Sequence, residues 1–251
     1  MLRSLDEIRG YTLLATDGEI GRAKDFLFDD DRWTVRYLVA DTGKWLPRRK
    51  VLLSPIFLDE PEWESQQIPV VLTKQMIENS PFLDEHAPVS RQVELDYYRY
   101  YSYAPYWIGT GPWGLYPTPA GYRAAATEAD PELVWDAAKE TSAHLRSIRE
   151  VIGYHIAAAD GEVGHVEDFV ADTTTWTIRW LVVDTGKWLL GRKVLISPAW
   201  SESVSWSERK LEVVLTTEQI ENSPKFDPSA PVNAGMETEL FDYYGRPRQR
   251  V

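Results

Sequence analysis

Residues Asp41–Pro55 read DTGKWLPRRKVLLSP, and residues Asp184–Pro198 read DTGKWLLGRKVLISP. Equal positions in the two stretches lie 143 residues apart, and the flanking segments Leu2–Pro81 and Leu145–Pro224 keep this spacing without insertion or deletion. Solenoid repeats have periods of about 20 to 50 residues, so a period this long is the size of a small domain. The sequence therefore predicts two copies of one small domain.

Turn signals between short apolar runs indicate the fold class of each copy. Asp17-Gly18 is a hairpin signal, because a tight hairpin turn needs positive φ, and Gly21 is expected at a bulge or a close-packing point. Thr34–Ala40 (TVRYLVA) reads as a strand, and Thr73–Asn79 reads as one or two helical turns. Short strands at close spacing are typical of a small barrel or sandwich. We expect a mainly β protein.

The duplication and a change in composition predict three segments. Residues 1–98 form a first domain with a helical tail, residues 99–143 form a linker rich in Tyr, Trp, Pro and Gly, and residues 144–251 form a second domain with a helical tail. Aromatic residues are unusual in a solvated spacer, so the linker is expected to lie extended on a domain surface or on a partner. Asp130-Pro131 is expected to begin a short helix near the end of the linker.

The two tails contain similar aromatic ends. Asp96-Tyr97-Tyr98 matches Asp242-Tyr243-Tyr244 at a spacing of 146 residues. This alignment predicts three additional residues in the second tail. Both tails read as helices.

Composition excludes several classes of function. The chain of 251 residues has no cysteine, which excludes disulfides, zinc–thiolate sites, iron–sulfur ligation and a cysteine nucleophile. Its net charge of -12 argues against direct nucleic-acid binding. No apolar run approaches the roughly 18 to 20 residues of a membrane-spanning helix, and the N-terminus lacks the apolar region of a signal peptide. We expect a cytoplasmic protein with no transmembrane segment.

The ordered motif GY, DGE[IV]G, DF, W, LV, DTGKWL, RKVL, SP and a closing NSP, present twice, resembles the PRC-barrel family. The resemblance implies two tandem small antiparallel β-barrels of about six strands each. Members occur in the cytoplasmic domain of the photosynthetic reaction-centre H subunit and in a bacterial ribosome-maturation factor. In both settings the module looks like an adaptor that docks on a larger assembly. This chain lacks the H subunit's transmembrane helix and the maturation factor's separate N-terminal domain.

The loops of the repeated stretch supply the candidate partner-binding residues. These are Trp45, Arg49 and Lys50 in the first copy and Trp188, Arg192 and Lys193 in the second. Each Trp could cap the end of a barrel or present a binding surface, since large aromatic side chains usually bury most of their area. The cations could belong to a solvated loop or form a docking patch for an acidic partner.

Other chemistry-bearing residues do not form a convincing pattern. Asp17 and Glu19 are explained by the turn, because a calcium loop needs ligands across twelve residues. The four histidines, His86, His144, His155 and His165, are scattered and are not repeated between the copies. No phosphate-binding loop or nucleophile elbow occurs. We therefore expect no catalytic, metal or cofactor site.

The sequence thus predicts a non-catalytic protein-binding adaptor built from duplicated PRC-type barrels and docking on a larger assembly. The identity of its protein partner is not predicted. The alternatives are a ribosome- or RNP-associated factor, an accessory protein of a photosynthetic electron-transfer complex, and an enzyme with an unrecognised site. Related copies can bury equivalent faces, so pseudo-two-fold pairing of the barrels or a homodimer is also expected.

Overall fold

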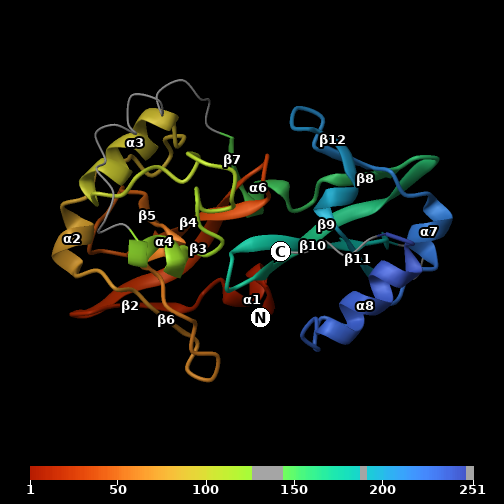
Figure 1. Cartoon of the computed structure of the whole chain (residues 1–251), viewed down its shortest axis with the longest axis horizontal. Coiled ribbons are helices and arrows are strands. Elements are labelled where there is room, and N and C mark those ends of the chain that lie inside the picture. Colours follow the sequence, from red (N-terminus) through yellow and green to blue (C-terminus); the bar gives the residue numbers. More distant parts are fainter. Residues whose placement is uncertain (126–143, 187–190, 247–251) are drawn as a thin grey trace. The chain divides into compact units, whose positions relative to one another are not determined.

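The computed structural model describes residues 1–125, 144–186 and 191–246 (Figure 1). Its contacts divide the chain into two compact units, which are described separately below. The N-terminal unit consists of Ile8–Ser147 and Thr173–Thr177. The C-terminal unit consists of Met1–Glu7, Ile148–Asp172 and Ile178–Val251. Helix α1 (Leu5–Ile8) contains the point at which the chain passes from one unit to the other.

The N-terminal unit is a mixed sheet with short helices at its margins. Its strands are β2 (Thr12–Ala15), β3 (Gly18–Asp29), β4 (Thr34–Asp41), β5 (Val51–Leu53), β6 (Gln67–Pro69) and β7 (Leu145–Ser147). Its helices are η1 (Pro55–Phe57), α2 (Lys74–Glu78), α3 (Arg91–Tyr100) and α4 (Pro119–Ala125). The strand order is β5-β4-β3-β2-β6, and β7 pairs with the C-terminal end of β3. All pairs are antiparallel except β2 with β6.

The C-terminal unit repeats this arrangement. Its strands are β1 (Leu2–Ser4), β8 (His155–Ala158), β9 (Gly161–Asp172), β10 (Thr177–Asp184), β11 (Lys193–Ile196), β12 (Ser201–Ser205) and β13 (Lys210–Val213). Its helices are α6 (Ile148–Val151), η4 (Pro198–Trp200), α7 (Thr217–Glu221) and α8 (Ala234–Tyr243). The strand order is β11-β10-β9-β8-β13-β12, with β1 on β9 and a parallel pair between β8 and β13.

The mainly β class is confirmed, with few helices and mixed rather than purely antiparallel pairing. Within the described part of each unit the strand order is open, so closed barrels are not confirmed. No helix in residues 1–125, 144–186 and 191–246 is long and apolar enough to cross a membrane.

The expected hairpin turn and the role of Gly21 are both confirmed. Ala15 pairs with Gly18 across the turn, and the register shifts where Leu13 pairs with Gly21. Gly21 has φ +130°, and a Cβ there would lie 2.0 Å from the Asp41 carbonyl oxygen. Only glycine allows β3 to approach the end of β4 this closely.

The short strand at the start of each sequence copy pairs with the other copy's long strand. Leu2–Ser4 pairs with Val170–Asp172 in the C-terminal unit, and Leu145–Ser147 pairs with Leu27–Asp29 in the N-terminal unit. Ser4 Oγ donates to Asp168 over 2.5 Å, and Ser147 Oγ donates to Asp25 over 2.5 Å. This reciprocal exchange was not predicted from the sequence.

The three-residue insertion predicted in the second tail is wrong. Helices α3 and α8 both have ten residues, and their ends lie 143 residues apart. Tyr100 Oη donates to the Met76 carbonyl, and Tyr243 Oη donates to the Gln219 carbonyl, each over 2.9 Å. The aromatic pair at the end of the helix is therefore Tyr100-Tyr101 in the first tail, which corresponds to Tyr243-Tyr244 without an insertion.

The aromatic segment that follows α3 packs within the N-terminal unit. Tyr106, Trp113 and Tyr122 are buried, and α4 packs against η1. The segment is thus a covering layer, as expected for chain lying on a domain surface. The helix predicted to begin at Asp130-Pro131 lies outside the described residues.

Candidate interaction site

A buried arginine lies within a polar cluster of the N-terminal unit. Arg36 comes from the middle of β4, a strand whose first seven residues are all buried, and its side chain is 0% exposed. Arg36 Nη2 lies 2.9 Å from Asp29 Oδ2, and Nε donates to the same oxygen over 3.3 Å. A buried charge must be paired and hydrogen-bonded, and Asp29 supplies the pair.

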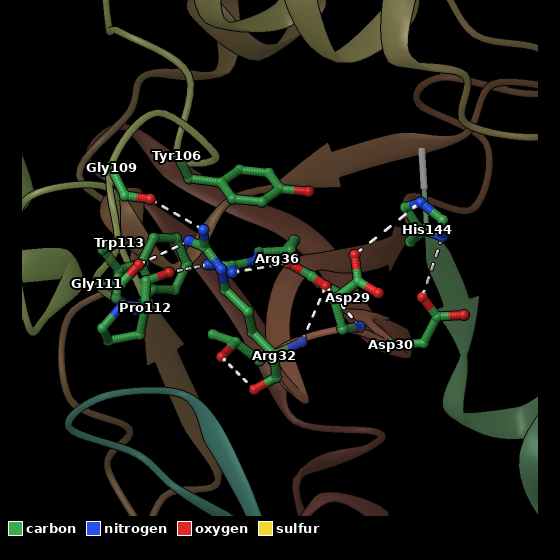
Figure 2. Close-up of polar contacts among 12 residues, drawn as sticks. Asp29, Asp30, Arg32, Arg36, Tyr106, Gly109, Gly111, Pro112, Trp113 and His144 are labelled. Atoms are coloured by element: carbon green, nitrogen blue, oxygen red, sulfur yellow. Dashed lines mark hydrogen bonds and ion pairs between the residues drawn. The ribbon is translucent and has the colours of Figure 1, made fainter. Parts of the chain in front are cut away.

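The aromatic segment supplies the remaining acceptors. Arg36 Nη1 donates to the Pro112 carbonyl, and Arg32 donates to the Gly109 and Gly111 carbonyls over 2.9 and 2.7 Å. Figure 2 shows these carbonyls gathered beside the two guanidinium groups. Because a guanidinium has five donors in a rigid fork, two arginines can hold a stretch of extended backbone.

A carboxylate on α3 binds the same segment from another side. Glu94 Oε1 accepts from Tyr37 Oη and Tyr106 Oη over 3.1 Å each, and Glu94 Oε2 lies 2.8 Å from Arg91 Nη1. The Glu94 side chain is 0% exposed, and this burial raises its pKa to about 7 despite the opposing effect of Arg91. Helix α3 presents Glu94 from its first turn, where Ser90 caps the helix.

Aromatic rings complete the contact. The Tyr106 ring centroid lies 3.9 Å from Arg36 Cζ, and the Trp113 ring lies 5.1 Å from it. Arg91 Cζ lies 3.8 Å from the Trp107 ring. These distances are within the range of cation–π attraction, which is strongest where water is excluded. Residues 106–113, which we call the covering segment, are thus bound by hydrogen bonds, charge and ring contacts together.

The C-terminal unit has an equivalent arginine and glutamate with different partners. Arg179 in β10 and Glu237 in α8 occupy the positions of Arg36 and Glu94 at the 143-residue spacing. Arg179 Nη2 lies 3.2 Å from Glu237 Oε1, which also accepts from Trp180 Nε1 over 3.1 Å. The Arg179 and Glu237 side chains are 14% and 22% exposed, so this pair reaches solvent.

The predicted tryptophan loops are described in one copy only. Trp45 is half-buried, and Lys74 Nζ lies 4.9 Å from its ring centroid. Trp188 lies outside the described residues. Trp45 therefore neither caps the sheet completely nor stands free, and it presents one ring face to a lysine.

The two loop arginines stabilise helix ends within their own units. Arg49 donates to the carbonyls of Ile77, Glu78 and Ser80, and Arg192 donates to those of Glu221 and Ser223. These carbonyls follow or end the short helices α2 and α7, where backbone acceptors lack helical partners. Both guanidinium groups are consequently occupied inside the protein, and less charge faces an acidic partner than the sequence predicts.

The loop lysines are also engaged. Lys50 Nζ donates to the Ala87 carbonyl, and burial lowers the Lys50 pKa. Lys193 Nζ lies 2.6 Å from Glu167 Oε1. The lysines therefore differ in partner between the copies, unlike the arginines.

One cluster in the N-terminal unit combines a histidine with two aspartates. His144 Nδ1 lies 3.5 Å from Asp30 Oδ1 (Figure 2). His144 Nε2 lies 4.0 Å from Asp31 Oδ2. Arg146 Nε donates to Asp30 Oδ2 over 3.0 Å, and burial raises the Asp30 pKa. One ligand atom from each of Asp30, Asp31 and His144 lies within 4.8 Å of the other two, a spacing that could hold a metal ion. Exposed acidic groups are common without a metal, and Arg146 already donates to Asp30, so the cluster does not by itself indicate a metal site.

Sequence reasoning missed Arg36, Glu94 and their counterparts. The available signal was an arginine inside an otherwise apolar strand, in TVRYLVA and again in TIRWLVV. Arginine is seldom fully buried unless it is paired. A repeated arginine at such a position therefore indicates a built polar contact.

A protein-family model matches part of the chain. The model of the PRC-barrel domain family matches residues 144–219, which lie in the second sequence copy. The match does not extend to the first copy, so a second PRC-barrel domain is not shown by it. No curated protein matches the chain. Residues 144–219 are therefore similar to the PRC-barrel domain, a module that suggests protein interaction.

Proposed function

We propose that this chain is a non-catalytic protein-binding adaptor with two PRC-type modules, one in each unit. The observation that carries the proposal is that the N-terminal unit already binds a protein segment. Arg32, Arg36 and Glu94 hold the covering segment through its backbone carbonyls and a tyrosine hydroxyl. A module that recognises extended chain in this way has the chemistry of an adaptor.

The equal spacing of elements supports two modules. Strands β2, β3 and β4 have the same lengths as β8, β9 and β10, and each pair begins 143 residues apart. Both units also place an arginine from an equivalent strand, β4 or β10, within electrostatic reach of a glutamate from the tail helix. Two related modules on one chain suit a protein that brings components of an assembly together.

The state of the buried acids supports a non-catalytic function. Glu94 has a raised pKa, which is a common sign of an active site. A general acid or base must reach its substrate, however, and Glu94 is 0% exposed beneath Tyr106 and Arg91. The shifted pKa therefore belongs to a structural contact.

The test is recovery of partners by the tagged chain from its native cells, with and without nuclease, at two salt concentrations. A captured protein must then bind the purified chain with a defined stoichiometry. We expect such a partner to persist after nuclease treatment. Recovery that depends on RNA would favour the RNP-associated alternative, and turnover of a substrate by the purified chain would contradict the non-catalytic proposal. Trp45→Ala, checked for folding, tests the predicted loop.

A further inference from the structure

We propose that Arg179 and Glu237 form a docking site in the C-terminal unit for an extended, uncharged partner segment that carries aromatic residues beside glycine and proline. The inference rests on the proposed adaptor function and names the surface and the partner chemistry. It is carried by the contrast between two equivalent arginine–glutamate positions: one is fully buried under the covering segment, and the other stays partly exposed over the residues that the structure describes.

The first step is that Arg179 has unused hydrogen-bonding capacity. In the N-terminal unit all three nitrogens of Arg36 have acceptors: Nε and Nη2 donate to Asp29 Oδ2, and Nη1 donates to the Pro112 carbonyl. Over the described residues Arg179 has a single acceptor, Glu237, which is bound by Nη2. Within residues 1–125, 144–186 and 191–246, neither its Nε nor its Nη1 donates to an acceptor, so we take both as donors for a ligand.

The second step is that Glu237 can also accept more. Both Glu94 oxygens are used, Oε1 by two tyrosine hydroxyls and Oε2 by Arg91. In the part of the chain that the structure describes, Glu237 accepts through Oε1 only. The helix position of Arg91 is taken by Ala234, so the C-terminal unit has no equivalent cation for the second oxygen.

The third step is that the pair is partly exposed and supported by aromatic packing. Arg179 and Glu237 are 14% and 22% exposed, whereas Arg36 and Glu94 are both 0% exposed. The Trp180 indole, which donates to Glu237, packs against Phe241 and Trp200 at centroid distances of 5.3 and 5.7 Å. A donor and an acceptor held in fixed positions at the surface are preorganised for binding.

The fourth step takes the ligand's chemistry from the covered site. There the arginine donates to a proline carbonyl, the glutamate accepts from a tyrosine hydroxyl, and a ring lies against the guanidinium. A strongly charged segment would meet either Arg179 or Glu237 with like charge, which disfavours it. The covering segment and its flanks, residues 103–116 (YAPYWIGTGPWGLY), carry no charged side chain and provide the probe.

The experiment is a titration of a fluorescein-labelled 103–116 peptide with the full chain, read by anisotropy. We expect saturable binding that weakens at least tenfold with Arg179→Ala and several-fold with Glu237→Gln. Lys225→Ala removes an exposed cation from the same unit and should leave binding unchanged. The Trp180 indole NH resonance should shift on peptide addition. A scrambled peptide and thermal unfolding of each variant serve as controls.

Two outcomes would overturn the inference. One is a failure of the wild-type chain to bind the peptide at millimolar concentration. The other is equal binding by wild type and Arg179→Ala, which would place the peptide elsewhere, for example in exchange with the covering segment. A cellular partner that Arg179→Ala retains would also overturn this site while leaving the adaptor function intact. Failure to recover any partner would instead count against the adaptor function itself.

Discussion

Arg36 and Arg179 occupy the same position in two equivalent strands, yet they are used differently. Arg36 pairs with Asp29 and binds the covering segment, while Arg179 pairs with Glu237 on the tail helix. In the C-terminal unit the counterpart of Asp29, Asp172, lies 3.1 Å from the Met1 amino group instead. The comparison teaches that the strand sets the position of the arginine. The chain that packs against the arginine determines which carboxylate it pairs with.

The two units differ at the position that lies near α4 in the N-terminal unit. Ile56 is buried in the N-terminal unit, where α4 packs on η1 and Arg123 pairs with Asp59 over 2.7 Å. Its counterpart in the C-terminal unit, Ala199, is exposed. A smaller apolar side chain reduces the hydrophobic area left in water. We therefore expect a segment docked at Arg179 and Glu237 not to extend over the surface around Ala199.

The largest predicted difference between the units comes from truncating the two arginines. Arg36→Ala leaves the buried Asp29 carboxylate without its paired cation and takes the arginine donor from the Pro112 carbonyl, and breaking a buried pair costs about 3 to 5 kcal/mol. Arg179→Ala removes a partly exposed pair and should cost about 1 kcal/mol or less. Urea unfolding of both variants measures the difference.

Hydrogen exchange assigns each effect to a unit. With Arg36→Ala, amides in β4 and in residues 106–113 should lose protection, while β10 and α8 keep theirs. Equal losses of stability for the two variants would show that the covering segment does not distinguish the sites.

The second prediction concerns pH. Burial raises the Glu94 pKa to about 7 from an ordinary value of 4.5, so the folded protein holds a proton that the unfolded chain releases. The stability from this group is therefore present below about pH 4.5 and is lost as pH rises to about 7. The loss is on the order of 1 to 3 kcal/mol.

Glu94→Gln should remove this contribution to the slope of unfolding free energy against pH. Glu237→Gln, the matched variant in the C-terminal unit, should retain it. Asp168, whose pKa burial raises to about 6, contributes a slope of the same sign and is common to all three proteins. An unchanged slope in Glu94→Gln would contradict the assignment.

Local signals in the sequence predict much of the fold. The Asp17-Gly18 turn, the glycine at position 21 and the helical turns of Thr73–Asn79, capped by Thr73, all act through nearby backbone, and each occurs as its residue type requires. The exchange of β1 and β7 could not be predicted in this way. Leu2–Ser4 has the same sequence as Leu145–Ser147, so its pairing partner depends on tertiary contacts and not on local preference.

The candidate site was less predictable than the fold. Arg49 and Arg192 have the composition of a docking patch, but their function as donors to helix-end carbonyls depends on residues about 30 positions further along the chain. Tyr97-Tyr98 was aligned by residue type with Tyr243-Tyr244, whereas packing places Tyr101 against Phe57 and Tyr244 against Trp200. Matching residue types therefore identify corresponding positions in the two copies less reliably than matching contacts do.

The third prediction tests the exchanged strand. Deleting Met1–Ser4 removes β1 and the Ser4 hydrogen bond to Asp168, and a hydrogen bond to a charged group contributes about 1.5 to 3 kcal/mol. We expect the loss in the C-terminal unit although the deleted residues begin the first sequence copy. Hydrogen exchange should rise at Val170–Asp172 and stay unchanged at Leu27–Asp29.

Ser147→Ala is the reciprocal control, because it removes the equivalent bond to Asp25 in the N-terminal unit. It should raise exchange at Leu27–Asp29 only. If the deletion raised exchange at Leu27–Asp29 instead, the strand pairing described here would be incorrect.

The smallest predicted effect tests the equivalence of the two tails. Tyr100 and Tyr243 each donate a partly exposed hydroxyl to a carbonyl of a short helix, so Tyr100→Phe and Tyr243→Phe should each cost about 0.5 to 1 kcal/mol. Tyr98→Phe is the comparison variant. The alignment by residue type pairs Tyr98 with Tyr244, whereas the alignment by structure pairs Tyr101 with Tyr244. Tyr98 is buried against Tyr106 and Trp107, so losing its hydroxyl leaves those ring contacts in place. If Tyr100→Phe and Tyr243→Phe give equal losses of stability, measured by urea unfolding, then the covering segment changes the arginine site without changing how the tail helix is held.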